Sequence, residues 1–240
     1  MKNITQMVSG KMKIAGVLFV LATAFSSCLK DNNDDVVTQP SALISVVNAS
    51  PDSQPLDFYL DQNRVNNSTG IVYGSGLDYR NAVTGKRTAS FNISGTSNKI
   101  KSDTMTLVAN RAYTLYLTNL VANPEYLLLK DTINRPTAGS ALVRFVHVSA
   151  NTPNVDLVTS TGTNIAVNKA YKTASGFTSI NAGKYTMQVR QAGTATVLAT
   201  ITDKDLVAGA VYTIWLQGVN SATDDVKKLT AKTQVNAYFQ

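Results

Sequence analysis

The sequence has 240 residues, of which 44% are hydrophobic and 15% charged, which is the composition of a globular protein. Its formal charge is +7, but Lys2, Lys11 and Lys13 lie in a segment that we expect to be removed, which leaves 19 basic and 15 acidic residues. No run of Lys or Arg is interleaved with aromatic residues, so we expect no nucleic-acid partner.

The first 27 residues have the pattern of an export signal. Positive charge precedes an apolar segment of twelve residues, 14–25, which is too short for a membrane span, since a span needs about 20 residues. Small residues then lead to Cys28, the only cysteine. The sequence FSSC resembles the bacterial lipobox, although Phe25 stands where Leu is usual. The resemblance implies that 1–27 is a lipoprotein signal peptide and that Cys28 carries a lipid; an ordinary signal with an incidental cysteine is the alternative.

Residues 28–40 contain the acidic stretch LKDNNDD and show no apolar periodicity, which predicts a flexible acidic tether. An acidic cluster directly after the cysteine resembles the surface-export signal of lipoproteins in the Bacteroidota. This implies a lipid-anchored protein of the outer membrane, on the cell surface, with the periplasmic face as the alternative. We expect no calcium at the tether, because an EF-hand loop needs a central Gly and a distal Glu.

Two stretches of the sequence occur twice, 99 residues apart. ALISVVNAS at 42–50 matches ALVRFVHVS at 141–149, and LVANRAYTLYL at 107–117 matches LVAGAVYTIWL at 206–216. Two anchors with one period indicate a tandem duplication of an ordinary domain size. Pro136 and Gly139 interrupt the pattern between the copies, which predicts a first domain, a short linker and a second domain. The predicted boundaries are 41–134, 135–140 and 141–240.

Short runs rich in β-branched residues, separated by Gly, Asn and Pro, predict strands and no helix in the mature chain. In the first repeat the expected strands are 42–48, 56–60, 71–73, 77–83, 87–93, 101–107, 112–118 and 126–131. In the second they are 141–148, 155–158, 166–169, 176–180, 184–191, 196–201, 210–217 and 230–239. We therefore expect an all-β protein made of two tandem immunoglobulin-like antiparallel β-sandwich domains.

The second copy, ALVRFVHVSANTPNVDL, resembles the signature of a bacterial family of exported proteins whose domain has no known function. In that family a Val-Arg-Phe-Val-His-Ala-Ser strand is followed by a Pro-containing turn, a Val-Asp strand and, much later, a Tyr-Thr strand. The matching residues include Arg144, His147, Pro153, Asp156 and Tyr212. The first copy is a weaker match: it keeps Pro51, Asp57 and Tyr113, with Ser45 and Asn48 in place of the Arg and the His. The resemblance implies an immunoglobulin-like sandwich and brings no reaction or ligand.

The motif residues are expected to be structural. In the two-residue alternation of a strand, His147 and Asn48 are the last residues on their face, where the strand runs into its turn. We expect them to hydrogen-bond the turn backbone. Asp57 and Asp156 are expected to bond amides of the preceding turn, with a calcium site near Asp57 as the alternative. Tyr113 and Tyr212 are expected to form tyrosine corners. One histidine and a lipid-modified cysteine lead us to expect no metal and no cofactor.

Two aromatic residues are the candidate binding residues. If Tyr113 faces the core of its domain, Tyr116 faces outward, and the same parity places Trp215 outward in the second domain. Outward aromatic side chains stack on sugars or anchor protein contacts. The alternative is that a loop or the neighbouring domain covers them.

No phosphate-binding loop, nucleophile elbow or zinc spacing is found in the sequence. We therefore expect a non-catalytic envelope lipoprotein for protein or glycan recognition or for surface assembly. The alternatives are a structural stalk and, less favoured, a hydrolase that uses surface carboxylates. The triplets Asp103-Thr104-Met105 and Asp131-Thr132-Ile133 resemble the O-glycosylation triplet of the Bacteroidota and are candidates for modification.

Overall fold

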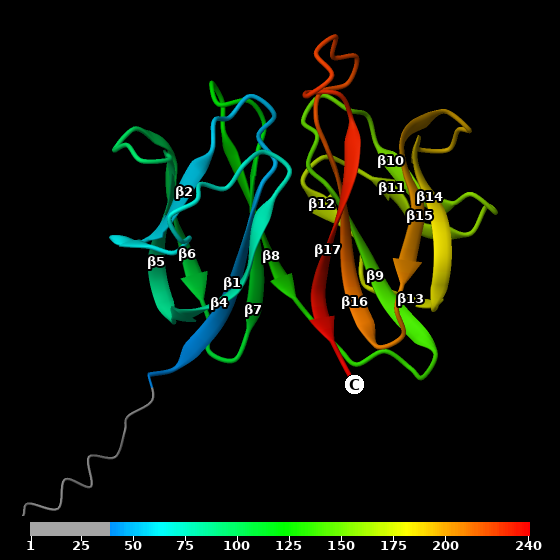
Figure 1. Cartoon of the computed structure of the whole chain (residues 1–240), viewed down its shortest axis with the longest axis horizontal. Coiled ribbons are helices and arrows are strands. Elements are labelled where there is room, and N and C mark those ends of the chain that lie inside the picture. Colours follow the sequence, from blue (N-terminus) through cyan, green and yellow to red (C-terminus); the bar gives the residue numbers. More distant parts are fainter. Residues whose placement is uncertain (1–38) are drawn as a thin grey trace, which may run out of the picture. The chain divides into compact units, whose positions relative to one another are not determined.

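The computed structural model describes residues 39–240, which form one compact unit built from strands and turns (Figure 1). The predicted signal peptide, Cys28 and most of the predicted tether lie outside the described residues. Within 39–240, no helix has the length and apolar character needed to cross a membrane.

The first repeat forms two four-stranded sheets that pack face to face. One sheet has the order β4-β1-β7-β8 and the other the order β3-β2-β5-β6. Ile44, Phe58, Phe91 and Leu115 belong to the apolar core between these sheets. The strands are β1 (Ser41–Asn48), β2 (Leu56–Leu60), β3 (Asn63–Arg64), β4 (Gly76–Val83), β5 (Gly85–Ile93), β6 (Lys99–Leu107), β7 (Ala112–Thr118) and β8 (Glu125–Asp131).

The second repeat has the same plan. Its sheets have the orders β12-β9-β16-β17, with β13 also paired to β9, and β11-β10-β14-β15. Val143, Phe145, Met187 and Ile214 belong to its core. The strands are β9 (Ser140–His147), β10 (Val155–Thr159), β11 (Asn164–Lys169), β12 (Thr173–Ala174), β13 (Thr178–Asn181), β14 (Gly183–Gln191), β15 (Val197–Leu206), β16 (Ala210–Gln217) and β17 (Thr230–Tyr238).

The predicted fold class, two tandem immunoglobulin-like β-sandwiches, is confirmed with one difference. Each repeat contains a parallel pair of strands, β1 with β7 and β9 with β16, where the sequence predicted antiparallel pairing throughout. Parallel neighbours need a crossover connection instead of a hairpin. Here the chain enters β7 from β6, in the opposite sheet, so β7 can run in the same direction as β1.

The sheets that contain β1 and β9 face each other between the two cores (Figure 1). In β1, alternate residues from Ala42 to Val46 point into the core of the first repeat, while Val47 and Ala49 contribute to a separate apolar cluster shared with the second repeat. The same holds for Val146 and Val148 in the second copy. The central strands β7 and β16 are therefore buried on both faces, which is why they read as nearly continuous apolar runs.

Candidate functional site

The apolar centre of the interface between the repeats consists of equivalent residues from the two copies. Val47, Ala49 and Tyr116 come from the first repeat, and Val146, Val148 and Trp215 come from the second, each 99 residues after its counterpart. The rings of Tyr116 and Trp215 meet edge to face with their centroids 6.2 Å apart, a favoured aromatic geometry. The two repeats therefore pack together through equivalent faces.

The prediction that Tyr116 and Trp215 form an exposed binding surface is wrong. Both side chains do point away from the core of their own sandwich, as the alternation predicts, but the opposite repeat covers them. Tyr116 is 0% exposed and Trp215 is 3% exposed. The indole nitrogen of Trp215 donates to the Gln217 side chain at 2.8 Å, so its one polar atom is also satisfied internally. These residues hold the repeats together and do not meet a ligand.

A buried ion pair joins the repeats beside this aromatic contact. The Arg144 Nη1 donates to Asp131 Oδ1 at 2.5 Å, and the side chains are only 4% and 0% exposed. Arg144 also donates to Thr213 Oγ1 from Nε and Nη2, at 3.2 and 3.0 Å, and its guanidinium lies over the ring of Phe177 at 4.8 Å. Each nitrogen of this buried guanidinium therefore donates a hydrogen bond, as burial of a charge requires.

The carboxylate of Asp131 is equally well satisfied. Its Oδ2 accepts from Tyr79 Oη and from Thr114 Oγ1, each at 2.6 Å. Tyr79 Oη in turn accepts from Asn236 Nδ2 at 3.1 Å, and Asn236 Oδ1 accepts from Thr213 Oγ1 at 2.6 Å. Burial, together with the adjacent negative charge of Asp131, raises the pKa of Tyr79, so this phenol remains a donor. We call Tyr79, Thr114, Asp131, Arg144, Thr213 and Asn236 the interface network.

The interface network is asymmetric although it joins two copies of one module. Thr114 and Thr213 are equivalent, yet the first donates to a carboxylate and the second to an amide oxygen. Arg144 corresponds to Ser45 in the first copy, and Phe177 corresponds to Tyr79. Ser45 Oγ accepts from Gln234 at 3.0 Å, which makes a neutral contact where the other side has an ion pair. The copies have therefore become complementary to each other, with the acid on one and the base on the other.

His147 hydrogen-bonds the turn after its strand, as the sequence predicts. Its Nε2 lies 3.2 Å from the carbonyl of Pro153, and its Nδ1 accepts from the Ser149 amide at 3.3 Å. These contacts fit the neutral ring with its proton on Nε2. Burial lowers the pKa of His147, which favours the same neutral form. In the first copy, Asn48 Oδ1 takes over the acceptor role towards the Ser50 amide.

The two motif aspartates bind a different turn from the one predicted. Asp57 Oδ2 accepts from the Gly95 amide at 3.0 Å, and Asp156 Oδ2 accepts from the Gly193 amide at 3.0 Å. Both glycines lie in the hairpin turns that follow β5 and β14. The aspartates reach these turns because β2 lies beside β5 and β10 lies beside β14. Asp57 also pairs with Arg64 at 2.6 Å. Within residues 39–240, no three His, Cys, Asp or Glu side chains gather where a metal ion could be held.

The tyrosine corners are present in both repeats. Tyr113 Oη accepts from the Val108 amide at 3.2 Å, and Tyr212 Oη accepts from the Val207 amide at 3.1 Å. The phenol thereby closes the corner between β6 and β7, and between β15 and β16, over five residues. This is a structural contact that fixes the entry into the buried strand.

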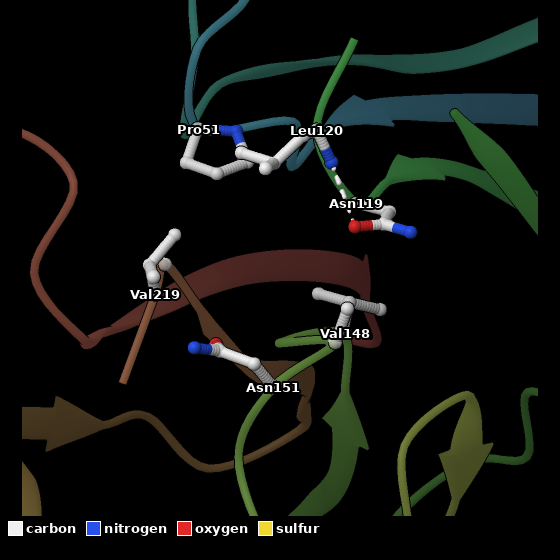
Figure 2. A pocket seen from close by; sticks show the side chains of 8 residues that line it. Pro51, Asn119, Leu120, Val148, Asn151 and Val219 are labelled. Carbon is white, nitrogen blue, oxygen red and sulfur yellow. Dashed lines mark hydrogen bonds between the residues drawn. The ribbon is translucent and has the colours of Figure 1, made fainter. Parts of the chain in front are cut away.

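A small apolar cavity lies at the end of the interface where β1 and β9 finish. It has a volume of about 110 Å³, below the range of roughly 300–1,000 Å³ that is typical of ligand pockets. Figure 2 shows Pro51 and Leu120 of the first repeat on one side and Val148 and Val219 of the second on the other. The side-chain oxygen of Asn119 accepts from the Leu120 amide at 2.9 Å, the dashed line in Figure 2, so its acceptor is already occupied.

A larger cleft lies at the opposite end, where β1 begins and β8 and β17 end. It has a volume of about 560 Å³, and its floor contains three members of the interface network: Asp131 and Asn236, which are buried, and Tyr79, which is half-buried. Its exposed polar rim consists of Ser41, Asn81, Asn110 and Arg111. Leu43, Ala112, Ile133 and Ala237 complete the lining.

The sequence predicted none of these cleft residues as a site. Asp131 was singled out only within a glycosylation triplet, and the structure buries its side chain in the interface network. The other triplet lies in the open, since Asp103 and Thr104 are exposed on β6. The one signal in the sequence was Arg144, because the first copy has the uncharged Ser45 at the same position. In the structure this charge is balanced by Asp131, which lies in the cleft.

Residues 42–158 match the model of a family described as Domain of unknown function (DUF4397). The family has no assigned activity in its name. The DUF4397 match covers the first repeat and the first two strands of the second, β9 and β10. It supports the predicted resemblance at the level of a domain of unknown function, while the bacterial lipoprotein type stays a prediction.

A search among curated proteins finds no match. Among solved structures, the chain is similar to CBMbc, a family 26 carbohydrate-binding module of Eubacterium rectale Amy13K in complex with maltoheptaose, with 10% identity, 81% and 95% of the two chains covered and a TM-score of 0.27. It is also similar to a streptococcal virulence factor described as binding alpha-glucan, with 11% identity, 80% and 97% covered and a TM-score of 0.27. At such low TM-scores this likeness carries no argument about function.

Proposed function

We propose that this chain is a non-catalytic recognition protein of the bacterial cell envelope that binds a glycan in the cleft between its two repeats. Lipid on Cys28 would hold it at the outer membrane, on the cell surface, and residues 28–40 would serve as the tether. The strands β1 and β8 would then present the cleft close to the point where the tether joins the fold.

The composition of the cleft carries this proposal. Its floor is already satisfied, because Tyr79, Asp131 and Asn236 bond one another or other members of the interface network. The rim is different: within residues 39–240, the side chains of Asn81 and Arg111 form no hydrogen bond or ion pair with another residue. Polar groups that converge on an open cleft without internal partners are available to a ligand.

A glycan fits this cleft better than a protein segment does. The volume of about 560 Å³ lies within the range of small-ligand pockets. Amide and hydroxyl groups on the rim match the alternating donors and acceptors of sugar hydroxyls, and Leu43, which is 40% exposed, offers an apolar surface to the carbon face of a sugar ring. Protein contacts most often centre on an exposed Trp, Tyr or Arg side chain, and the two aromatic candidates, Tyr116 and Trp215, are buried.

The same geometry disfavours the hydrolase alternative. Acid-base hydrolysis of a glycosidic bond uses two carboxyl groups about 5–10 Å apart. Asp131 is the one carboxylate among the cleft residues, and it is held by Arg144, Tyr79 and Thr114. Asp57, which the sequence suggested as a hydrolase carboxylate, lies on β2, in the sheet of the first repeat that does not line the cleft. It is bound to Arg64 and to the Gly95 amide.

The proposal is tested with the mature chain, Cys28 to Gln240, made soluble by Cys28→Ser and applied to a glycan array. We expect binding to a defined set of glycans, and Asn81→Leu should abolish it by filling the rim with an apolar side chain. Ser179→Leu is the matched control, because Ser179 is the counterpart of Asn81 on β13 and lies outside the cleft. An array without any binding would contradict the proposal and favour the structural stalk.

A further inference from the structure

The cleft has a positive electrostatic character that its residue composition alone does not reveal. Its carboxylate, Asp131, is neutralised by the guanidinium of Arg144 at 2.5 Å, and its side chain is 0% exposed. Burial keeps this pair in a low-dielectric region, where the two charges largely cancel towards the outside. The charged group that remains at the mouth of the cleft is Arg111.

Arg111 has no charged counterpart in the second repeat. The equivalent residue is Ala210, which is buried beside the C-terminal segment. Arg111 immediately precedes β7, and its backbone carbonyl accepts from the Leu43 amide at 2.8 Å. The backbone at the base of the side chain is thus fixed by the sheet, while the side chain is exposed and forms no ion pair within residues 39–240.

We infer that the ligand of the cleft is an acidic glycan, one that carries a carboxylate or sulfate, and that Arg111 binds the acidic group. This inference rests on the proposed function. A guanidinium offers a planar fork of N–H donors that binds a carboxylate or sulfate through two parallel hydrogen bonds. Ser41, Asn81 and Asn110 on the same rim are neutral and would bind sugar hydroxyls.

The test compares an oligogalacturonate with a neutral oligogalactoside of the same length and linkage, and with its sulfated derivative, by calorimetric titration of the Cys28→Ser mature chain. We expect the uronate or the sulfated sugar to bind at least about tenfold more tightly than the neutral sugar, because its hydrogen bonds with the guanidinium are charge-assisted. Which of the two binds more tightly identifies the acidic group.

Arg111→Gln should remove this preference and reduce the salt dependence of binding, and Arg111→Lys should restore part of it. Arg80→Gln is the control: Arg80 is an exposed arginine on β4, next in sequence to Asn81, but it lines a different groove with Arg64 and Arg87. Equal affinity for acidic and neutral sugars, unchanged in Arg111→Gln, would overturn the inference and leave the proposed function intact. Absence of binding to all three sugars and to the glycan array would overturn both.

Discussion

His147 and its counterpart Asn48 show how a single position can keep its role while its chemistry changes. Each side chain accepts a hydrogen bond from the backbone amide two residues later, His147 from Ser149 and Asn48 from Ser50. The sequence could predict this, because the alternation of a strand and the turn that follows it are local properties. Only the histidine, however, can take up a proton, so the two repeats respond differently to acid.

Stability should therefore depend on pH through His147. Burial lowers the pKa of His147 below its ordinary 6.5, so the unfolded chain binds a proton at a pH where the folded chain does not. The contribution of the neutral His147 to the free energy of unfolding should be fully present above about pH 6.5. It should be lost progressively as the pH falls below that value. Denaturant unfolding of His147→Asn should show a flatter pH profile in this range. An unchanged profile would show that the histidine is not held in its neutral form.

The burial of Trp215 could not be predicted from the pattern of its own strand. The alternation of β16 predicts correctly that its side chain leaves the core of its own sandwich, but it carries no information about what lies beyond. That depends on the angle at which two modules pack, which is set by contacts between residues far apart in the sequence, such as Trp215 with Tyr116.

Replacing Trp215 by Ala should destabilise the protein by about 3–5 kcal/mol, because it removes a large buried side chain and leaves a cavity. Chemical denaturation measures this loss. Val167→Ala is a suitable control, since Val167 is a hydrophobic residue that is 52% exposed on β11. A loss below about 1 kcal/mol, as expected for an exposed side chain, would mean that the first repeat does not cover this tryptophan.

At the scale of elements, most strands could be predicted from the sequence. The predictions for 56–60, 112–118 and 210–217 coincide with β2, β7 and β16, since turn residues mark their ends clearly. The predicted strand 71–73 is absent, and Ile71 forms only an isolated bridge to Leu56. The parallel pairing of β1 with β7 could not be predicted, because period-two patterns fix the face of a residue and not the neighbour or direction of its strand.

The contact between β8 and β9 can be tested through its ion pair. Asp131→Asn should cost about 3–5 kcal/mol, because it leaves Arg144 buried without a counter-charge. The double change Asp131→Asn with Arg144→Met should cost clearly less than the sum of the two single changes, since it removes both charges. A double-mutant cycle in chemical denaturation measures the coupling. Additive effects would show that the two groups do not interact.

On the scale of the whole molecule, the two repeats bury equivalent faces against each other. The apolar centre keeps matching positions in both copies, while the surrounding network differs, with Asp131 and Arg144 on opposite sides. The cleft exists only because the two repeats meet, since its lining combines Tyr79 and Arg111 of the first with Asn236 of the second. For that reason no pattern within a single copy could predict the candidate site.

The face-to-face packing of the two repeats can be tested by the fluorescence of Trp215, because this is the only tryptophan in the chain. We expect a blue-shifted emission and strong protection from acrylamide quenching in the intact mature chain, because the first repeat covers the indole. In denaturant, both properties should change together to those of free tryptophan. A red-shifted emission in the folded chain, with free access of acrylamide, would contradict the packing on which the cleft and its proposed ligand depend.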